Sequence, residues 1–135
     1  MKEYMDKNLQ NLVFIVDDNS VILTMAASAL QNDFKVLTMS SAQRMFSLFE
    51  KKKPDIILLD IEMPETSGFE VIAKLKENPN WQDIPVLFLT GWNDEKILAA
   101  AKEAGAADVI QKPIVPSILL ESVKKHIINA NRNNE

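Results

Sequence analysis

Short apolar runs alternate along the chain with segments in which apolar residues recur at spacings of three and four. Runs of four to seven apolar residues are typical of buried strands, whereas apolar residues spaced three and four apart lie on one face of a helix. Five runs have the strand character, at positions 12–16, 34–39, 55–59, 84–90 and 107–111. A strict alternation of strand and helix predicts a parallel sheet with helices on both faces.

The polar content of the five runs predicts where each strand lies in the sheet. The first, third and fourth runs are almost wholly apolar, as expected for strands that are buried on both faces. The second run contains Lys35 and Thr38, and the fifth contains Asp108 and Gln111. We therefore expect the second and fifth strands at the two edges.

Capping residues support the same division into elements. Small polar side chains stand where the helices should begin, at Asn19 or Ser20, Ser41, Ser67 and Asn93. Gly105 stands where a helix should end.

Length and composition limit the class of protein. The 135 residues suffice for one hydrophobic core, so we expect a single domain over residues 10–130, with tails at 1–9 and 131–135. The net charge of -4 argues against sequence-independent binding to nucleic acid or to an anionic membrane, which requires a basic surface. No cysteine and no stretch of 18 apolar residues is present, which favours a cytoplasmic protein.

The polar residues at the ends of the strands are the candidates for chemistry. In open parallel sheets the ligand site lies beyond the carboxyl ends of the strands. Asp17 and Asp18 follow the first run, Asp60 follows the third, Thr90 ends the fourth, and Lys112 follows the fifth. Each alone has an ordinary explanation as a turn, cap or loop residue, but together they should meet at one edge of the sheet.

This set of side chains is suited to accepting a phosphoryl group. Carboxylates about 4 Å apart repel one another by roughly 4 kcal/mol near a protein surface, and a counter-charge relieves that repulsion. Acidic ligands without histidine or cysteine favour a hard cation, and Mg²⁺ is the usual partner of a few carboxylates and a phosphoryl group. Lys112 and Thr90 could then bind phosphoryl oxygens while one carboxylate attacks phosphorus.

Five features of the sequence occur together: the Asp17 and Asp18 pair, "DIEMPETSG" at 60–68, the Thr90 and Gly91 pair, "GAAD" at 105–108, and the Lys112 and Pro113 pair. With these features the chain resembles, over about residues 12–129, the receiver domain of bacterial two-component response regulators. The resemblance implies a flavodoxin-like, doubly wound α/β fold with five helices and a five-stranded parallel sheet of order 2-1-3-4-5.

The resemblance also implies roles for the acidic residues. Asp60 would accept the phosphoryl group from a histidine kinase or a histidine phosphotransfer protein. Asp18 and Asp60 would ligate Mg²⁺ directly, Asp17 would act through water, and Glu62 would contribute its backbone carbonyl. The domain would catalyse only its own phosphorylation and dephosphorylation, and would signal by a conformational change through contacts with other proteins.

The remaining site residues follow from the same resemblance. Thr90, with Gly91 beside it, would move toward the phosphoryl group, and Lys112 would pair with it. The bond between Lys112 and Pro113 is expected to be cis, a geometry whose cost is small only before proline. No contact with nucleic acid or membrane is expected from this domain.

One position departs from the family pattern. Three residues before the lysine, receivers usually carry a tyrosine or phenylalanine that rotates inward when the threonine moves, and this chain has Val109. Valine cannot perform that rotation, so we expect a working phosphorylation site whose signal leaves by a different surface. Trp92 and Glu62, two residues beyond Thr90 and Asp60, are expected to flank the phosphoryl group, and His126 is expected on the surface.

Three other interpretations fit part of the pattern. Haloacid dehalogenase-like phosphatases use similar residues, but their nucleophile precedes the acidic pair, and Glu62 replaces the aspartate that their general acid step needs. A flavin-binding module would need a phosphate-binding loop where the acidic "DDNSVIL" stands. A receiver that serves only as an interaction module is the third alternative, which Val109 favours and the complete acidic set disfavours.

Overall fold

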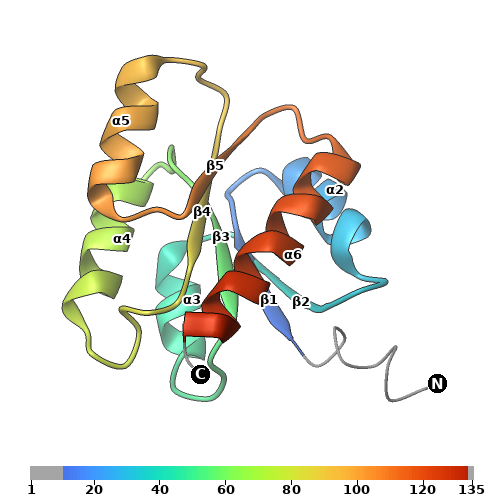
Figure 1. The fold of residues 1–135 in the computed structure, drawn as a ribbon. Coiled ribbons are helices and arrows are strands. Elements are labelled where there is room, and N and C mark those ends of the chain that lie inside the picture. The colour runs from blue at the N-terminus through green and yellow to red at the C-terminus, as the bar shows by residue number, and fades with distance from the viewer. Residues whose placement is uncertain (1–10, 134–135) are drawn as a thin grey trace.

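The computed structural model describes residues 11–133, which form one five-stranded parallel sheet of order β2-β1-β3-β4-β5 with five helices (Figure 1). The strands are β1 (Leu12–Val16), β2 (Lys35–Met39), β3 (Ile56–Asp60), β4 (Val86–Thr90) and β5 (Asp108–Gln111). The helices are α2 (Ser20–Leu30), α3 (Ala42–Leu48), α4 (Gly68–Glu77), α5 (Glu95–Ala104) and α6 (Pro116–Asn133). The predicted class, strand order and edge positions of β2 and β5 are confirmed. None of the helices in this range is long and apolar enough to cross a membrane.

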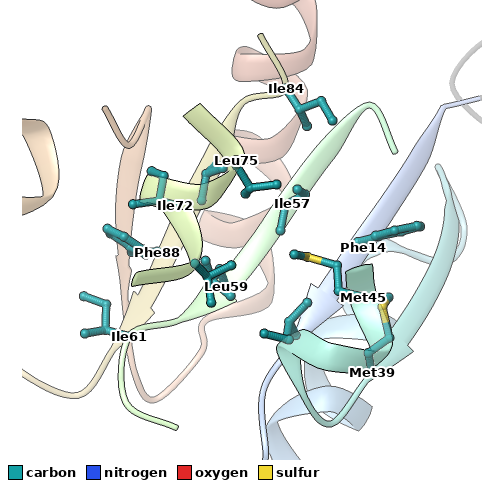
Figure 2. Close-up of a cluster of buried hydrophobic side chains, with 14 of the residues drawn as sticks. Phe14, Met39, Met45, Ile57, Leu59, Ile61, Ile72, Leu75, Ile84 and Phe88 are labelled. Atoms are coloured by element: carbon teal, nitrogen blue, oxygen red, sulfur yellow. The ribbon is translucent and has the colours of Figure 1, made fainter. Parts of the chain in front are cut away.

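The helices divide between the two faces of the sheet. Helices α2 and α6 cover one face, and α3, α4 and α5 cover the other (Figure 1). The strands β1, β3 and β4 supply side chains to a buried cluster on each face. Figure 2 shows the cluster beneath α3 and α4, in which Phe14, Leu59 and Phe88 from the three central strands lie among residues of both helices. This double burial holds the carboxyl ends of the central strands in fixed positions.

Several element boundaries differ from the sequence-based expectation. Strand β3 runs one residue further than expected and ends at Asp60 itself. Strand β4 begins at Val86 because Pro85 has no N–H for the ladder, although its carbonyl accepts a bond from Ile57. The cap of α5 is Asp94 rather than Asn93, since the Asp94 carboxylate accepts the Lys96 amide at 2.8 Å.

The last helix extends into the segment that was expected to be the C-terminal tail. Helix α6 continues to Asn133, although a tail was expected from residue 131. No proline or glycine occurs after Pro116, so nothing in the local sequence stops the helix at that point. The expected tail at residues 1–9 lies outside the described part of the chain.

Candidate functional site: an acidic cluster with one lysine

Three carboxylates meet at the carboxyl ends of the neighbouring strands β1 and β3. Asp17 and Asp18 follow β1 directly, and Asp60 is the last residue of β3. One carboxylate oxygen from each of the three lies within 4.8 Å of the other two. Asp17 is 0% exposed and Asp60 is 3% exposed, whereas Asp18 is open to solvent. The fold thus brings together the acidic residues that the sequence predicts, and it buries two of them.

Lys112 supplies the positive charge at this cluster. Its ammonium Nζ lies 2.8 Å from Asp17 Oδ2 and 3.1 Å from Asp60 Oδ1. The Lys112 amide donates to the Thr90 carbonyl at 2.7 Å, which fixes the start of the loop after β5 against the end of β4. The peptide bond between Lys112 and Pro113 is cis, the geometry that the resemblance implies.

The surroundings of Asp60 disfavour its ionised form. Burial, followed by the charge of Asp17, raises the pKa of Asp60 to about 6, although hydrogen bonds from Lys112 and the Glu62 amide act in the opposite direction. Burial alone would lower the pKa of Lys112, but its bonds to Asp17 and Asp60 outweigh burial and raise it. Lys112 is therefore charged at neutral pH, and a single ammonium does not fully compensate the carboxylates.

The polar atoms of the cluster fit a hard divalent cation. Asp17 Oδ1 accepts the Asn19 amide at 2.9 Å. Within residues 11–133, the buried Oδ2 of Asp17 receives no hydrogen bond of good geometry, although Lys112 Nζ lies close to it. Exposed Asp18 leaves the cluster open to solvent on one side. An all-oxygen, negatively charged set that Lys112 does not fully neutralise is suited to Mg²⁺.

Close packing around Asp60 explains the glycine of the "DIEMPETSG" segment. The Gly68 amide donates to the Ile61 carbonyl at 2.7 Å, where α4 begins against the end of β3. A Cβ atom at Gly68 would lie 2.8 Å from the Asp60 carbonyl and 2.9 Å from Ile61 Cα. Both are backbone atoms with little freedom to move, so only glycine fits without displacing the strand end that carries Asp60.

Thr90 and Trp92 lie at the carboxyl end of β4, the strand that pairs with β3. Thr90 ends β4 and is buried, while Gly91 and Trp92 beyond it are exposed. The Thr90 hydroxyl oxygen accepts the Trp92 amide at 3.1 Å. The indole N–H of Trp92 donates to the Glu62 carboxylate, which links the loops that follow β3 and β4. Sequence reasoning placed both residues beside the site but missed this bond, whose signal is that each stands two residues beyond a neighbouring strand end.

Comparison with known proteins agrees with this geometry. Residues 13–124 match the response regulator receiver domain. The chain belongs to this family of signalling domains. As a receiver it is 36% identical to the phosphate regulon transcriptional regulatory protein PhoB of Pseudomonas aeruginosa over 113 residues, which are 83% of this chain and 49% of that protein.

Solved receivers share the fold over nearly their whole length. The chemotaxis response regulator CheY4 of Vibrio cholerae superimposes with a TM-score of 0.80 at 26% identity, covering 86% of this chain and 98% of that one. The BeF3-activated DrrB receiver domain gives a TM-score of 0.79 at 28% identity, covering 89% and 98%. Against the first three curated relatives, by contrast, this receiver spans only 27%, 17% and 49% of their length.

The position that departs from the receiver pattern lies in the edge strand. Val109 pairs with Phe88 of β4 and is half-buried against the cluster beneath α5. Its side chain is therefore part of the packing between the sheet and α5, next to the strand that ends at Thr90. Whether the signal avoids this route stays a prediction.

The expectation that His126 lies on the surface is wrong. The His126 side chain is only 13% exposed, and its Nε2 lies 3.2 Å from Asp108 Oδ2. The Ser122 hydroxyl donates to the same oxygen at 2.9 Å. Sequence reasoning treated Asp108 as a polar residue of an edge strand and missed that α6 covers this edge. The signal was the spacing of four between Ser122 and His126, which places both on one face of α6.

Proposed function

We propose that this receiver accepts a phosphoryl group on Asp60 from the phosphohistidine of a histidine kinase or a histidine phosphotransfer protein, in a reaction that depends on Mg²⁺. The observation that carries the proposal is the position of Asp60, which is buried at the end of a central strand and shares the Lys112 ammonium with Asp17. Membership in the receiver family supports it.

The chemistry requires an ionised Asp60 with a free oxygen. Because the pKa of Asp60 is about 6, its carboxylate is mostly ionised at neutral pH. Lys112 and the Glu62 amide both bind Oδ1, which leaves Oδ2 for attack on phosphorus. The new O–P bond forms as the P–N bond of the donor breaks. The imidazole leaves with the electron pair and takes a proton from solvent.

Asp17, Asp18 and Asp60 would hold the cation, with the backbone carbonyl of Glu62 as a further ligand. When bound, Mg²⁺ screens the negative charge that the carboxylates present to an incoming phosphoryl group. Lys112 would pair with a phosphoryl oxygen, and the position of its ammonium 3.1 Å from Asp60 Oδ1 supports this role. Thr90 would exchange its bond with the Trp92 amide for a bond to the phosphoryl group, and this exchange would start the conformational change.

Treatment with acetyl phosphate and Mg²⁺, followed by intact mass, tests the acceptor. The wild-type protein should gain the mass of one phosphoryl group, and Asp60→Asn should gain none. Asp55→Asn is a matched control, because Asp55 is an exposed carboxylate next to the same strand. An adduct on the Asp60→Asn protein, or none on wild type with or without Mg²⁺, would remove the proposal.

We further propose that Trp92 controls the lifetime of the phosphorylated state. Trp92 is 57% exposed beside the site and its indole is held to the β3–α4 loop by Glu62, so it would obstruct the approach of attacking water. Trp92→Ala should shorten the lifetime severalfold, whereas Trp92→Phe, which keeps a ring but loses the N–H, should have a smaller effect. Equal lifetimes for all three proteins would contradict the role.

The valine at position 109 leads to the last part of the proposal, that the signal leaves by a surface other than that of β5. Beryllofluoride, a phosphoryl mimic, can be added to ¹⁵N-labelled protein with Mg²⁺, and the amide shifts compared. The largest changes should fall in the loops after β3 and β4 and in α4. Changes centred on Val109 and β5 would show that the usual route persists without the ring.

A further inference from the structure

A groove of about 820 Å³ lies between α3 and α4. Asp18, the exposed member of the acidic cluster, is part of its lining. The two helices cover the same face of the sheet (Figure 1). The apolar part of its lining consists of buried Ala42 and Val71, half-buried Phe46 and Met63, and exposed Pro64. A groove of this volume between two helices, with apolar residues beside polar ones in its lining, is large enough for the side chains of a bound peptide.

The charges around the groove are mostly negative. Asp18, Glu50 and Glu65 line it as exposed carboxylates, and Lys74 is the basic residue among its lining. Within residues 11–133, none of these three carboxylates forms an ion pair. A lining that combines apolar side chains with unpaired acidic groups is complementary to an apolar side chain flanked by positive charge.

One cation of this chain already lies against an aromatic ring of the groove. Lys74 Nζ, from α4, lies over the ring of Phe46, from α3, at 5.9 Å from its centroid. The ring is held in place by Phe49 and Trp81, whose centroids each lie 5.7 Å from that of Phe46. Phe46 therefore presents a fixed aromatic face to the groove, and the ammonium of another chain could replace that of Lys74.

We propose that this groove binds a basic amphipathic peptide segment of a partner protein. An apolar side chain of the segment packs on Phe46 and Met63, and its lysine or arginine side chains face Asp18, Glu50 and Glu65. The site is separate from the phosphoryl acceptor but shares Asp18 with the acidic cluster.

The shared aspartate makes binding at the two sites competitive. This step rests on the proposed function, in which Asp18 ligates Mg²⁺. A peptide cation paired with Asp18 opposes Mg²⁺ binding, and Mg²⁺ opposes the peptide by the same factor, because coupling between two sites is reciprocal. The groove is then a place where a partner distinguishes the metal-loaded receiver from the metal-free one.

Fluorescence anisotropy with a labelled probe peptide tests the groove. The probe is a short helical peptide with leucine on one face and lysine on the other, and its control replaces every lysine with glutamate. Glu50→Lys combined with Glu65→Lys should weaken binding of the lysine peptide about tenfold, since two attractions become repulsions. Glu103→Lys combined with Glu121→Lys, on exposed positions of α5 and α6 outside the groove, is the control with the same change in net charge.

A second pair of variants distinguishes the groove from a general preference for positive charge. Lys74→Gln removes the competing cation from Phe46 and should tighten binding about threefold, whereas Lys102→Gln on α5 should change it less. Amide shifts on titration should centre on Phe46, Met63 and Lys74. Equal losses in the two double variants, equal binding of the glutamate peptide, or shifts centred on α5 or α6 would overturn the site.

Mg²⁺ provides the test of competition. In the metal-free protein the probe should bind more tightly than with MgCl₂, when NaCl keeps the ionic strength equal. An equal affinity under both conditions would overturn the competition. The adduct on Asp60 is measured without the peptide, so a failure of the proposed function is distinguished from a failure of the groove.

Discussion

Two carboxylates at opposite ends of the sheet, Asp60 and Asp108, have opposite environments. Asp60 ends β3 at the carboxyl edge, where a second buried carboxylate faces it and its pKa is raised. Asp108 begins β5 at the amino edge. Burial alone would raise its pKa, but hydrogen bonds from the Val109 amide, the Ser122 hydroxyl and His126 outweigh burial and lower it. The surroundings therefore disfavour the ionised form of Asp60 and stabilise that of Asp108.

The difference separates a group built for chemistry from one built for stability. Both Asp108 oxygens accept hydrogen bonds within 3.2 Å, so the residue fastens β5 to α6 and has little capacity for a further ligand. The acidic cluster instead retains unrelieved repulsion and an oxygen of Asp17 without a well-aligned donor. Unbalanced buried charge of this kind is typical of functional sites.

Removing the positive charge of Lys112 should have the largest effect on the free energy of unfolding. Lys112→Met leaves Asp17 and Asp60 without a counter-charge, and breaking a buried pair in this way costs about 3 kcal/mol of unfolding free energy. Urea unfolding with EDTA at pH 7.5 measures the loss. At pH 5 Asp60 is mostly protonated and the loss should shrink. The same loss at both pH values would show that Lys112 acts through packing rather than charge.

Mg²⁺ should stabilise the folded domain through Asp60 and not through Asp108. At a free concentration ten times its Kd, a ligand of the native state adds about 1.4 kcal/mol to the unfolding free energy. The gain should decline as the pH falls below about 6, because protonated Asp60 no longer contributes its charge to the cluster. Melting temperatures with MgCl₂, against NaCl of equal ionic strength, measure it. Asp60→Asn should lose most of the gain and Asp108→Asn should keep it; the reverse order would place the cation elsewhere.

The sequence predicted most of the fold because the pattern of polar residues was strong where burial was strong. The central strands are nearly free of polar residues, so their order and the meeting of Asp17, Asp18 and Asp60 followed from the alternation and the resemblance. Boundaries were less certain, since the residues at a strand end, such as Pro85 and Asp60, depend on hydrogen bonds to neighbouring strands.

Contacts between side chains that are distant in the sequence could not be read from any pattern. The bond between Trp92 and Glu62 joins two loops whose spacing is set by the sheet. The bonds of Ser122 and His126 to Asp108 depend on how α6 crosses the edge strand. In both cases the residues were noticed in the sequence, but their partners were determined only by the packing of whole elements.

The two carboxylates should respond to neutralisation with opposite signs. Because the folded pKa of Asp60 lies above its ordinary value of 3.8, ionising it costs stability as the pH rises from about 4 to about 6. Metal-free Asp60→Asn should therefore gain about 1 kcal/mol at pH 7.5 and nothing near pH 4.

Asp108→Asn should lose about 1 kcal/mol at pH 7.5, the typical worth of a hydrogen bond to a partly exposed group. Because its folded pKa is lowered, the contribution of Asp108 is present above its ordinary value and lost as the pH falls through the lowered value. Urea unfolding of both variants across this range gives the signs, and a gain on neutralising Asp108 would end the contrast.

His126 should give the smallest effect of the set. The bond from His126 to Asp108 is the longest of the three that this carboxylate accepts. Ser122 would still donate to the same oxygen in a variant that lacks His126. His126→Gln should cost about 0.5 kcal/mol at pH 7.5. The double variant His126→Gln with Asp108→Asn should lose less stability than the sum of the two single losses, because both changes remove the same contact. Fully additive losses would mean that His126 stabilises α6 through packing alone and that Asp108 is satisfied without it.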